Sequence, residues 1–235
     1  MAHCICIRIT LKFKRIGKGD IKLSGHKAMT KVYVFDFSNF SNIENDTLYF
    51  SFLTQTEKEC ALQKKNELIK RQYIYSRVLL KYVVSINGFQ YGEMIKNKNG
   101  KPYFKETPFF NISHSGNIVA VAISDKEVGV DVQKETVVSK QVMDNFFSEE
   151  EREYIKKGEI TADALWCVKE SIFKYYGTGI VSDINMAEIL IEKGNIILKN
   201  KIGLFIKNIC KNGYCISVCA EESGTRDIEF IFLQS

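Results

Sequence analysis

The 235-residue sequence predicts an α+β fold made of two similar subdomains, each an antiparallel sheet packed with helices. First, strand-like and helix-like stretches follow one another in roughly the same order in the two halves, although the halves share no recognisable sequence identity. Second, short turns join successive strand-like runs, which favours antiparallel pairing. Third, 45% hydrophobic and 26% charged residues are typical of a globular chain. No apolar run approaches the roughly 18 residues that span a bilayer, so we expect no membrane association.

The basic charge of the chain is concentrated in residues 1–28. This segment has seven basic residues and one acidic residue, which gives it a formal net charge of +6. The whole chain has a net charge of +5, so the remaining residues sum to −1. We therefore expect no nucleic-acid partner for the body of the protein. The segment is either a targeting peptide or an extension with no role in the fold. We favour the extension, because a long apolar core and a small-residue cleavage site are missing.

The remaining chain divides into an N-terminal subdomain, 29–125, and a C-terminal subdomain, 126–235. The first of these is expected to open with a strand at 31–37, which is rich in β-branched and aromatic residues. Helical spacing then predicts one long helix from about 56 to 85. Its apolar stripe is formed by Leu62, Leu68, Ile69, Tyr73, Val78 and Leu79. A loop with a turn at NKNG and three short strands follow, the strands at 109–113, 117–124 and 127–133.

The C-terminal subdomain is expected to begin with helices. Ser148 and Glu151 form a capping-box pattern at a helix start. A further helix spans about 161 to 176 and ends at Gly177. Strand-like runs complete the chain, and KGN between the first two predicts a hairpin. These runs lie at 187–193, 195–200, 202–209, 214–220 and 228–233.

The seven cysteines are an odd number and include no CxxC pair. Cys60 and Cys167 fall in helical stretches. Cys215 and Cys219 fall in an apolar strand, where we expect them to be small core residues. This distribution favours a reducing, cytoplasmic location over a disulfide framework.

Asp131 interrupts an otherwise apolar strand. Side chains at i and i+2 of a strand share a face, so Asp131 and Gln133 are expected to point the same way, with Val130 and Val132 on the other face. A carboxylate and an amide oxygen are hard ligands that suit magnesium. The alternative interpretation is an edge-strand aspartate that faces water.

Glu170 and Lys174 lie one turn apart on the second predicted helix, on the same face as Trp166. One interpretation is an ordinary surface ion pair, worth only about 0.3–0.5 kcal/mol. The other is a metal ligand followed by a cation that binds phosphate.

His114 is the single histidine outside residues 1–28, and it lies at a predicted turn between Ser113 and Ser115. Hydroxyls, an imidazole and exposed backbone N–H groups suit an anion. The cations that could join them are Lys101, Arg71 and Arg77. The alternative is a solvated turn histidine.

Four short motifs occur in a fixed order: G-K-P at 100–102, N-I-S-H-S at 111–115, G-V-D at 129–131 and W-x-x-K-E-S-x-x-K at 166–174. Together they resemble the 4′-phosphopantetheinyl transferase superfamily, in particular its two-subdomain, surfactin-synthetase-activating type. The resemblance extends from about Met29 to the end of the chain.

This resemblance implies transfer of the phosphopantetheine arm of coenzyme A to a serine of an acyl or peptidyl carrier protein, with release of adenosine 3′,5′-bisphosphate. Such carriers serve fatty-acid, polyketide or nonribosomal-peptide synthesis. It also implies a requirement for Mg²⁺, with Mn²⁺ as the alternative metal. The implied fold is a pseudo-twofold pair of α+β subdomains with coenzyme A in the cleft between them.

Carried over to this sequence, the resemblance assigns Asp131 and Glu170 to the metal, with Glu170 also the base for the carrier serine. It places Lys174 at the attacked phosphate or the leaving oxygens. Where the family often has a glutamate, this chain has Gln133, whose neutral oxygen would bind the metal directly or through water. The expected consequence is weaker magnesium affinity or a different metal preference.

The resemblance also assigns the groups that hold coenzyme A. Ser113 and His114 would contact its phosphates, His114 at the 3′-phosphate. Lys101 and Pro102 would line the adenine and 3′-phosphate side. Arg71 and Arg77 would add positive charge.

Two other functions stay open on the sequence. One is a non-catalytic module of the same fold that binds coenzyme A or a carrier protein; Gln133 favours it, whereas the presence of Glu170 and Lys174 argues against it. The other is a different magnesium-dependent phosphoryl enzyme or a nucleotide-binding module, but the sequence has neither G-x-x-x-x-G-K-[ST] nor G-x-G-x-x-G. We expect a monomer, because both halves of the implied site lie in one chain.

Overall fold

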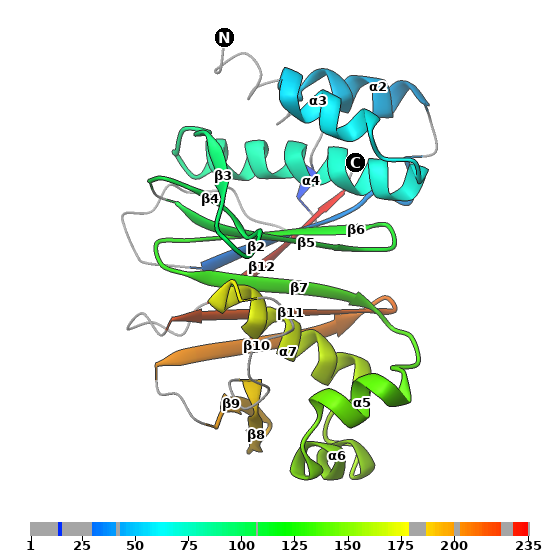
Figure 1. Ribbon diagram of the computed structural model, residues 1–235, viewed down its shortest axis with the longest axis vertical. Coiled ribbons are helices and arrows are strands. Elements are labelled where there is room, and N and C mark those ends of the chain that lie inside the picture. The colour runs from blue at the N-terminus through cyan, green and yellow to red at the C-terminus, as the bar shows by residue number, and fades with distance from the viewer. Residues whose placement is uncertain are drawn as a thin grey trace.

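The computed structural model describes residues 14–15, 30–40, 43–106, 108–178, 187–199, 203–221 and 228–234. Within this part of the chain, the fold is α+β, with antiparallel sheets packed with helices, as predicted (Figure 1). Most of the segment 1–28 lies outside the described residues. The pseudo-twofold relation and the division at 125/126 remain predictions.

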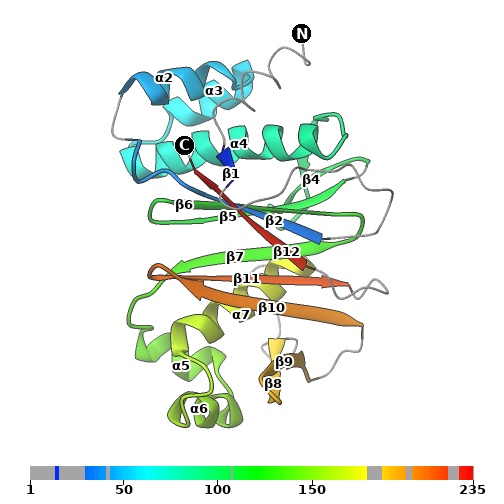
Figure 2. The same cartoon turned by 180° about the vertical axis from the view of Figure 1, so that it is seen from behind.

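The larger sheet has five strands in the order β1-β12-β2-β6-β5. Its strands are β1 (Lys14–Arg15), β12 (Ile228–Gln234), β2 (Thr30–Asp36), β6 (Ile118–Ser124) and β5 (Phe109–Ser115). The last strand of the chain, β12, does not join the C-terminal sheet but pairs with β2, and this pair is parallel (Figure 2). The pairing of β1 with β12 gives the segment 1–28 a contact with the fold that the sequence did not predict.

The smaller sheet has three antiparallel strands in the order β10-β11-β7. These are β10 (Leu204–Lys211), β11 (Tyr214–Glu221) and β7 (Val128–Lys134). Two short hairpins lie outside both sheets, β3 (Met94–Lys96) with β4 (Pro102–Phe104), and β8 (Ile189–Glu192) with β9 (Asn195–Leu198). The predicted KGN hairpin is confirmed, since Lys193 and Gly194 both have the positive φ of a type I′ turn between β8 and β9.

Side chains that alternate along β2 separate two cores. Tyr33 and Phe35 pack on the side covered by helix α4 (Glu67–Ile86), whereas Val32 and Val34 face the three-stranded sheet. The period of two follows from the pleat of the strand. On β7 the valines at 128, 130 and 132 face this middle core. Asp131 therefore points to the opposite face, which helix α7 (Ala162–Tyr176) covers (Figure 1).

The predicted long helix at 56–85 is two helices. Helix α3 (Gln55–Leu62) ends at Gln63, and α4 begins after the N-cap Asn66. The break explains why half of the predicted apolar stripe was wrong: Leu62, Leu68 and Ile69 lie near the break and are 65%, 40% and 48% exposed, whereas Val78 and Leu79 are fully buried. Among the residues that the structure describes, one further helix, α2 (Ile43–Ser51), precedes α3.

Three helices follow β7. They are α5 (Lys140–Phe146), α6 (Glu149–Lys156) and α7. Ser148 and Glu151 form the predicted capping box of α6, and Thr161 caps α7. Gly177, with φ of 62°, ends α7 in the left-handed conformation that favours glycine, as predicted.

One cysteine expectation is corrected. Cys210 and Cys215 lie opposite each other in the β10–β11 hairpin and form a disulfide. Cys219, in contrast, is buried in the core, as expected.

None of the helices in the described part of the chain is both long and apolar enough to cross a membrane.

Candidate active site

Strand β7 and helix α7 approach each other unusually closely at Gly129. A Cβ at this position would lie 2.1 Å from the carbonyl oxygen of Ser171 and 2.3 Å from the backbone nitrogen of Tyr175. Any larger residue would have to move the helix. The glycine of G-V-D therefore brings α7 against β7, and this contact sets the position of the residues that α7 carries.

Asp131, the next residue on that face, is buried and bound by three side chains. Lys174 Nζ lies 2.5 Å from its Oδ1, and the Ser113 hydroxyl donates to the same oxygen over 2.9 Å. The Gln133 amide donates to Oδ2 over 2.9 Å. The prediction that Asp131 and Gln133 share a face is confirmed, and an edge aspartate facing water is not what the structure shows. Lys174 supplies the opposite charge that a buried carboxylate needs.

The N-I-S-H-S motif joins the two sheets. At alternate positions of β5, Asn111 Oδ1, Ser113 Oγ and Ser115 Oγ accept hydrogen bonds from backbone N–H groups of β7, at 3.0, 3.2 and 3.0 Å. Ser113 Oγ also accepts a bond from Lys174 over 2.8 Å. Together with its bond to Asp131, these contacts use the one donor and both lone pairs of the Ser113 hydroxyl. The hydroxyl thus orients Asp131 and Lys174, and its predicted contact with coenzyme A stays a prediction.

Glu170 lies one turn before Lys174 on α7 and is partly buried. Burial, and then the negative charge of Asp131, raise the pKa of Glu170 to about 7, while Lys174 acts in the opposite direction. A carboxyl group that gains and loses a proton near neutral pH suits general acid–base catalysis. Two carboxylates that repel each other also suit a shared cation.

A pocket of about 270 Å³ opens beside these residues. Its walls come from the G-K-P loop, from β5 and from the end of α7, so three of the four sequence motifs meet there. The lining residues are Asn99, Gly100, Lys101, Pro102, Asn111, Ile112, Glu170, Phe173, Lys174 and Gly177. Ile112 and Phe173, which the sequence did not single out, give the pocket an apolar wall beside the charged groups of α7.

Lys101 lines this pocket, but its ammonium group is bound elsewhere. Lys101 Nζ lies 2.6 Å from Glu127 Oε2, 2.9 Å from Tyr175 O and 3.3 Å from Val128 O. In the same loop, the Asn99 side chain donates to Gly177 O over 2.8 Å. The loop therefore binds the C-terminal end of α7, and the Lys101 ammonium, which the sequence assigned to a phosphate side, is used in that contact.

His114, near the end of β5, lies close enough to Arg77 of α4 and to Lys174 for their charges to affect it. The His114 side chain is exposed, yet the surrounding protein lowers its pKa, first by desolvation and then through the charges of Lys174 and Arg77. Arg77 Nε is buried without a hydrogen-bond partner among the described residues. The positive charges of Arg77 and Lys174, beside an imidazole that can donate through its N–H, suit an anion.

Arg71 is not brought to this group. Its guanidinium donates to Phe40 O and lies over the rings of Phe37 and Tyr75, at 5.3 and 5.7 Å from their centroids. Its contacts stabilise the packing of α4 rather than the pocket.

Comparison with known proteins matches the part of the chain that holds the last two of the four motifs. The family model described as "4'-phosphopantetheinyl transferase superfamily" matches residues 127–221, which include β7, α7 and β11. This chain belongs to the 4′-phosphopantetheinyl transferase superfamily.

Several relatives in the superfamily carry the transferase name. "4'-Phosphopantetheinyl transferase gsp" of Aneurinibacillus migulanus is 26% identical over 178 residues, which are 70% of this chain and 74% of the relative. "4'-Phosphopantetheinyl transferase Sfp" of Bacillus subtilis (strain 168) is 25% identical over 206 residues, 81% of this chain and 92% of the relative. "4'-Phosphopantetheinyl transferase ffp" of Bacillus subtilis is 32% identical over 133 residues, 52% of this chain and 59% of the relative. The homology is distant but covers most of the chain.

The superfamily motif on α7 contains a structural lysine that the sequence analysis did not single out. Lys169, the first lysine of W-x-x-K-E-S-x-x-K, is completely buried and forms an ion pair of 2.8 Å with Glu151. Lys169 also donates to Ala187 O, and Glu151 accepts from Ile189 N, both over 3.0 Å. Glu151 was recognised only as half of a capping box. The pair fixes α6 and β8 to the helix that bears Glu170.

The residues present fit the divalent cation that the superfamily implies. Asp131 and Glu170 are close enough for one charge to shift the pKa of the other, and Gln133 can add an amide oxygen by turning its side chain. Such an all-oxygen set suits Mg²⁺. Gln133 contributes no negative charge, so only two carboxylates, Asp131 and Glu170, would neutralise a cation here.

Proposed function

We propose that this chain transfers the 4′-phosphopantetheine arm of coenzyme A to a serine hydroxyl of an apo carrier protein and releases adenosine 3′,5′-bisphosphate. The observation that carries the proposal is the convergence of Asp131, Glu170 and Lys174 beside a pocket lined by the G-K-P loop. Family membership and the names of the relatives support the same reaction. Acyl or peptidyl carrier proteins and coenzyme A are the partners that this function requires.

In this reaction the serine oxygen forms a new bond to phosphorus, and the phosphorus–oxygen bond within the pyrophosphate breaks. Glu170 accepts the proton of the serine hydroxyl, a role that its raised pKa suits. Lys174 stabilises the charge that develops on the phosphoryl oxygens. Bound Mg²⁺ would polarise the phosphoryl group and neutralise the pyrophosphate, with Asp131 and Glu170 as its ligands and Gln133 beside them.

Lys174 has two roles that it cannot fill at the same time. In the structure it neutralises Asp131. With a cation on Asp131, Lys174 would no longer have to compensate the buried carboxylate, and its ammonium would be free to turn to the phosphate. Its side chain is 30% exposed, which leaves room for this movement.

Coenzyme A also fits the apolar wall of the pocket and the polar groups outside it. Ile112, Phe173 and Pro102 offer apolar surface in the pocket. His114 and Arg77 offer groups for the 3′-phosphate outside it.

The test is the intact mass of an apo acyl carrier protein after incubation with the full chain, coenzyme A and Mg²⁺. We expect a mass gain of one phosphopantetheine arm. It should disappear with EDTA and with a carrier whose acceptor serine is replaced by alanine. Binding of coenzyme A without any gain on fatty-acid, polyketide and peptide carriers would contradict the proposal. It would instead support the non-catalytic module that Gln133 favours.

A further inference from the structure

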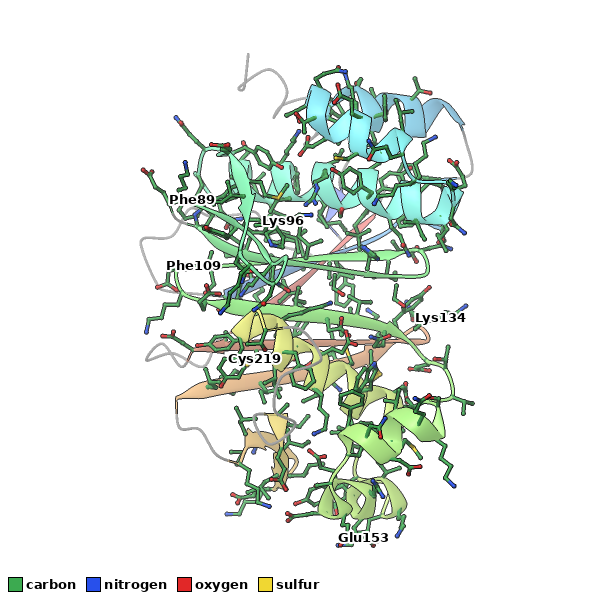
Figure 3. The ribbon with its side chains drawn as sticks, in the orientation of Figure 1. Phe89, Lys96, Phe109, Lys134, Glu153 and Cys219 are labelled. Atoms are coloured by element: carbon green, nitrogen blue, oxygen red, sulfur yellow. A yellow bond between two sulfur atoms is a disulfide. The ribbon has the colours of Figure 1, made fainter. Side chains whose placement is uncertain are left out.

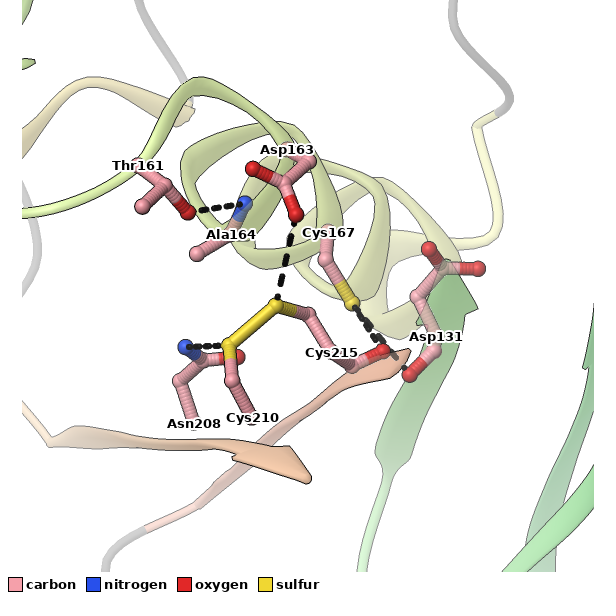
Figure 4. Close-up of a disulfide and its surroundings, with 8 residues drawn as sticks. All are labelled: Asp131, Thr161, Asp163, Ala164, Cys167, Asn208, Cys210 and Cys215. Atoms are coloured by element: carbon pink, nitrogen blue, oxygen red, sulfur yellow. Dashed lines mark hydrogen bonds between the residues drawn. A yellow bond between two sulfur atoms is a disulfide. The ribbon is translucent and has the colours of Figure 1, made fainter. Parts of the chain in front are cut away.

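The tip of the β10–β11 hairpin brings two cysteines together at the end of β7, where Cys215 lies opposite Gln133. Cys210 and Cys215 are directly opposed in the antiparallel register, with their Cα atoms 4.1 Å apart. The turn between the strands is Asn212–Gly213, and both residues have the positive φ of a type I′ turn. This tight turn fixes the two sulfur atoms against each other, and they form a disulfide (Figure 4).

A carboxylate completes a three-ligand group at the same place. An oxygen of Glu135 and the two sulfur atoms all lie within 4.8 Å of one another. The backbone N–H of Glu135 donates to Gly213 O over 2.8 Å, so the residue is tied to the hairpin turn. Figure 3 shows the neighbouring Lys134 at this end of β7, close to that turn. Cys210 and Glu135 are exposed, which opens the group to solvent, whereas Cys215 anchors it in the interior.

A second carboxylate lies beside the buried sulfur. Asp163, in the first turn of α7, has its Oδ2 3.7 Å from Cys215 Sγ. If both cysteines are reduced and deprotonated, two thiolates and two carboxylates gather in a small volume. Their mutual repulsion is relieved either by formation of the disulfide or by a bound cation.

We propose that the reduced Cys210–Cys215 pair binds a thiophilic divalent cation such as Zn²⁺, with Glu135 as the third ligand. Two thiolates and a carboxylate are a donor set typical of zinc, and the exposed side leaves a fourth position for water or for Asp163. The disulfide is the metal-free, oxidised state of the same two sulfurs. A small-molecule thiol reduces it to two thiols and is itself oxidised to a disulfide, and binding of the cation then releases the two thiol protons.

This site uses other atoms than the proposed magnesium site. The Cys167 thiol lies between the two regions, 3.4 Å from Asp131 O and 3.3 Å from Cys215 O (Figure 4). Asp131 turns its carboxylate to Lys174, and its backbone carbonyl accepts from Cys167. The chemistry separates the sites too, because thiolates bind zinc far better than magnesium.

The test is a titration of the reduced full chain with Co²⁺ in the presence of excess Mg²⁺, which occupies sites built from oxygen ligands. Co²⁺ bound by thiolates gives a ligand-to-metal charge-transfer band in the near ultraviolet, and Co²⁺ bound by oxygens does not. We expect one such site per chain and displacement by Zn²⁺. The exposed Cys210→Ser variant should lose the band, and Glu135→Gln should weaken binding by about tenfold or more.

Matched controls locate the site. A variant with both Cys4→Ser and Cys6→Ser, and a second variant with Cys60→Ser, should keep the band, whereas prior oxidation of the wild-type chain with a small-molecule disulfide should remove it. A reduced chain that gives no thiolate band would overturn the proposal. So would a band that survives Cys210→Ser, or an affinity that Glu135→Gln leaves unchanged. None of these results depends on carrier modification, so they also stand apart from the proposed transferase function.

Discussion

At the scale of single residues, the site depends on how a buried carboxylate is compensated. Asp131 is 1% exposed and is bound by Lys174, Ser113 and Gln133. Lys174 comes from another element, so neutralising the carboxylate also fixes α7 over β7. Charge compensation and catalytic placement are thus achieved by the same contact.

The two lysines of the α7 motif are expected to have different roles, Lys169 in stability and Lys174 in catalysis. Lys169→Met leaves Glu151 buried without its cation, which should lower the free energy of unfolding by about 3–5 kcal/mol. Lys174→Met removes the group that stabilises phosphoryl charge, and transfer should fall by roughly 10²–10³-fold. Lys174 is 30% exposed and Lys169 only 1%, so water can partly replace the lost ammonium in the second variant, and its stability should change less.

Urea unfolding and initial rates of carrier modification check this separation when both are measured for both variants. An unchanged urea midpoint for Lys169→Met, or an unchanged rate for Lys174→Met, would contradict the roles assigned to them.

At the scale of elements, the closest contact in the site is between the backbones of β7 and α7. Gly129→Ala would put a methyl group 2.1 Å from Ser171 O, and only a shift of the helix relieves this clash. We expect a loss of about 3 kcal/mol in the free energy of unfolding. Transfer should fall as well, because α7 carries Glu170 and Lys174.

Gly92→Ala is the matched control. A Cβ at Gly92 lies 3.6 Å from its nearest neighbour, Phe104 Cδ1, and the substitution should change stability by less than about 0.5 kcal/mol. If Gly129→Ala and Gly92→Ala had the same urea midpoint and the same transfer rate, the close contact between β7 and α7 would not be required.

The ion pair between Glu57 of α3 and Lys81 of α4 is expected to make stability depend on pH. Burial raises the pKa of Glu57, but Lys81 Nζ at 2.5 Å, the Thr54 N–H and the Tyr91 hydroxyl outweigh it and hold the pKa below its usual 4.5. A group with a lowered folded pKa stabilises the fold above its unfolded value, and this contribution is lost as pH falls through the folded value.

Glu57→Gln should therefore cost about 1.5–3 kcal/mol at neutral pH and progressively less below pH 4.5. Urea unfolding of wild type and variant across this range measures the difference, with the exposed Glu59→Gln as control. If the difference in unfolding free energy between wild type and Glu57→Gln stayed constant down to well below pH 4.5, the role assigned to Glu57 would be contradicted.

The elements were predictable where local chemistry determines them. The caps of α6 and α7, the hairpin turns, and the shared face of Asp131 and Gln133 follow from residue type and spacing. The break between α3 and α4, which left Leu62, Leu68 and Ile69 exposed, arises from a turn at 63–66 that helical periodicity does not reveal. The buried pair of Lys169 and Glu151 joins residues from separate helices, so no local pattern signals it.

At the scale of the whole molecule, side chains rather than a shared ladder of backbone hydrogen bonds join the two sheets beside the site. Asn111, Ser113 and Ser115 bind the backbone of β7 from the larger sheet. The loop at Asn99 and Lys101 binds the end of α7. The sequence located these motifs, and the assignment of Ser113 and Lys101 to coenzyme A, which the resemblance implies, stays a prediction. Their contacts within the protein could not be predicted, because the partners lie on strands and helices far along the chain.

Lys101→Met tests this coupling between the two halves. Loss of the Lys101 ammonium leaves Tyr175 O and Val128 O without this donor, so the free energy of unfolding should fall by about 1–3 kcal/mol. The rate constant of transfer should fall as well, since the end of α7 loses support. Measurement of urea midpoints and of kcat and KM checks this. A raised KM for coenzyme A with unchanged stability and kcat would instead assign the ammonium directly to the ligand.

The central claim is that the carboxylates of Asp131 and Glu170 carry out group transfer, and Glu170→Gln tests it most directly. The measurement is the intact mass of an apo carrier protein, followed in time with wild type and variant side by side, with circular dichroism to confirm that the variant is folded. We predict that wild type adds one phosphopantetheine arm and that the folded variant adds essentially none, because the amide neither accepts the serine proton nor supplies the charge of a metal ligand. A folded variant that modifies the carrier at the wild-type rate would contradict the account.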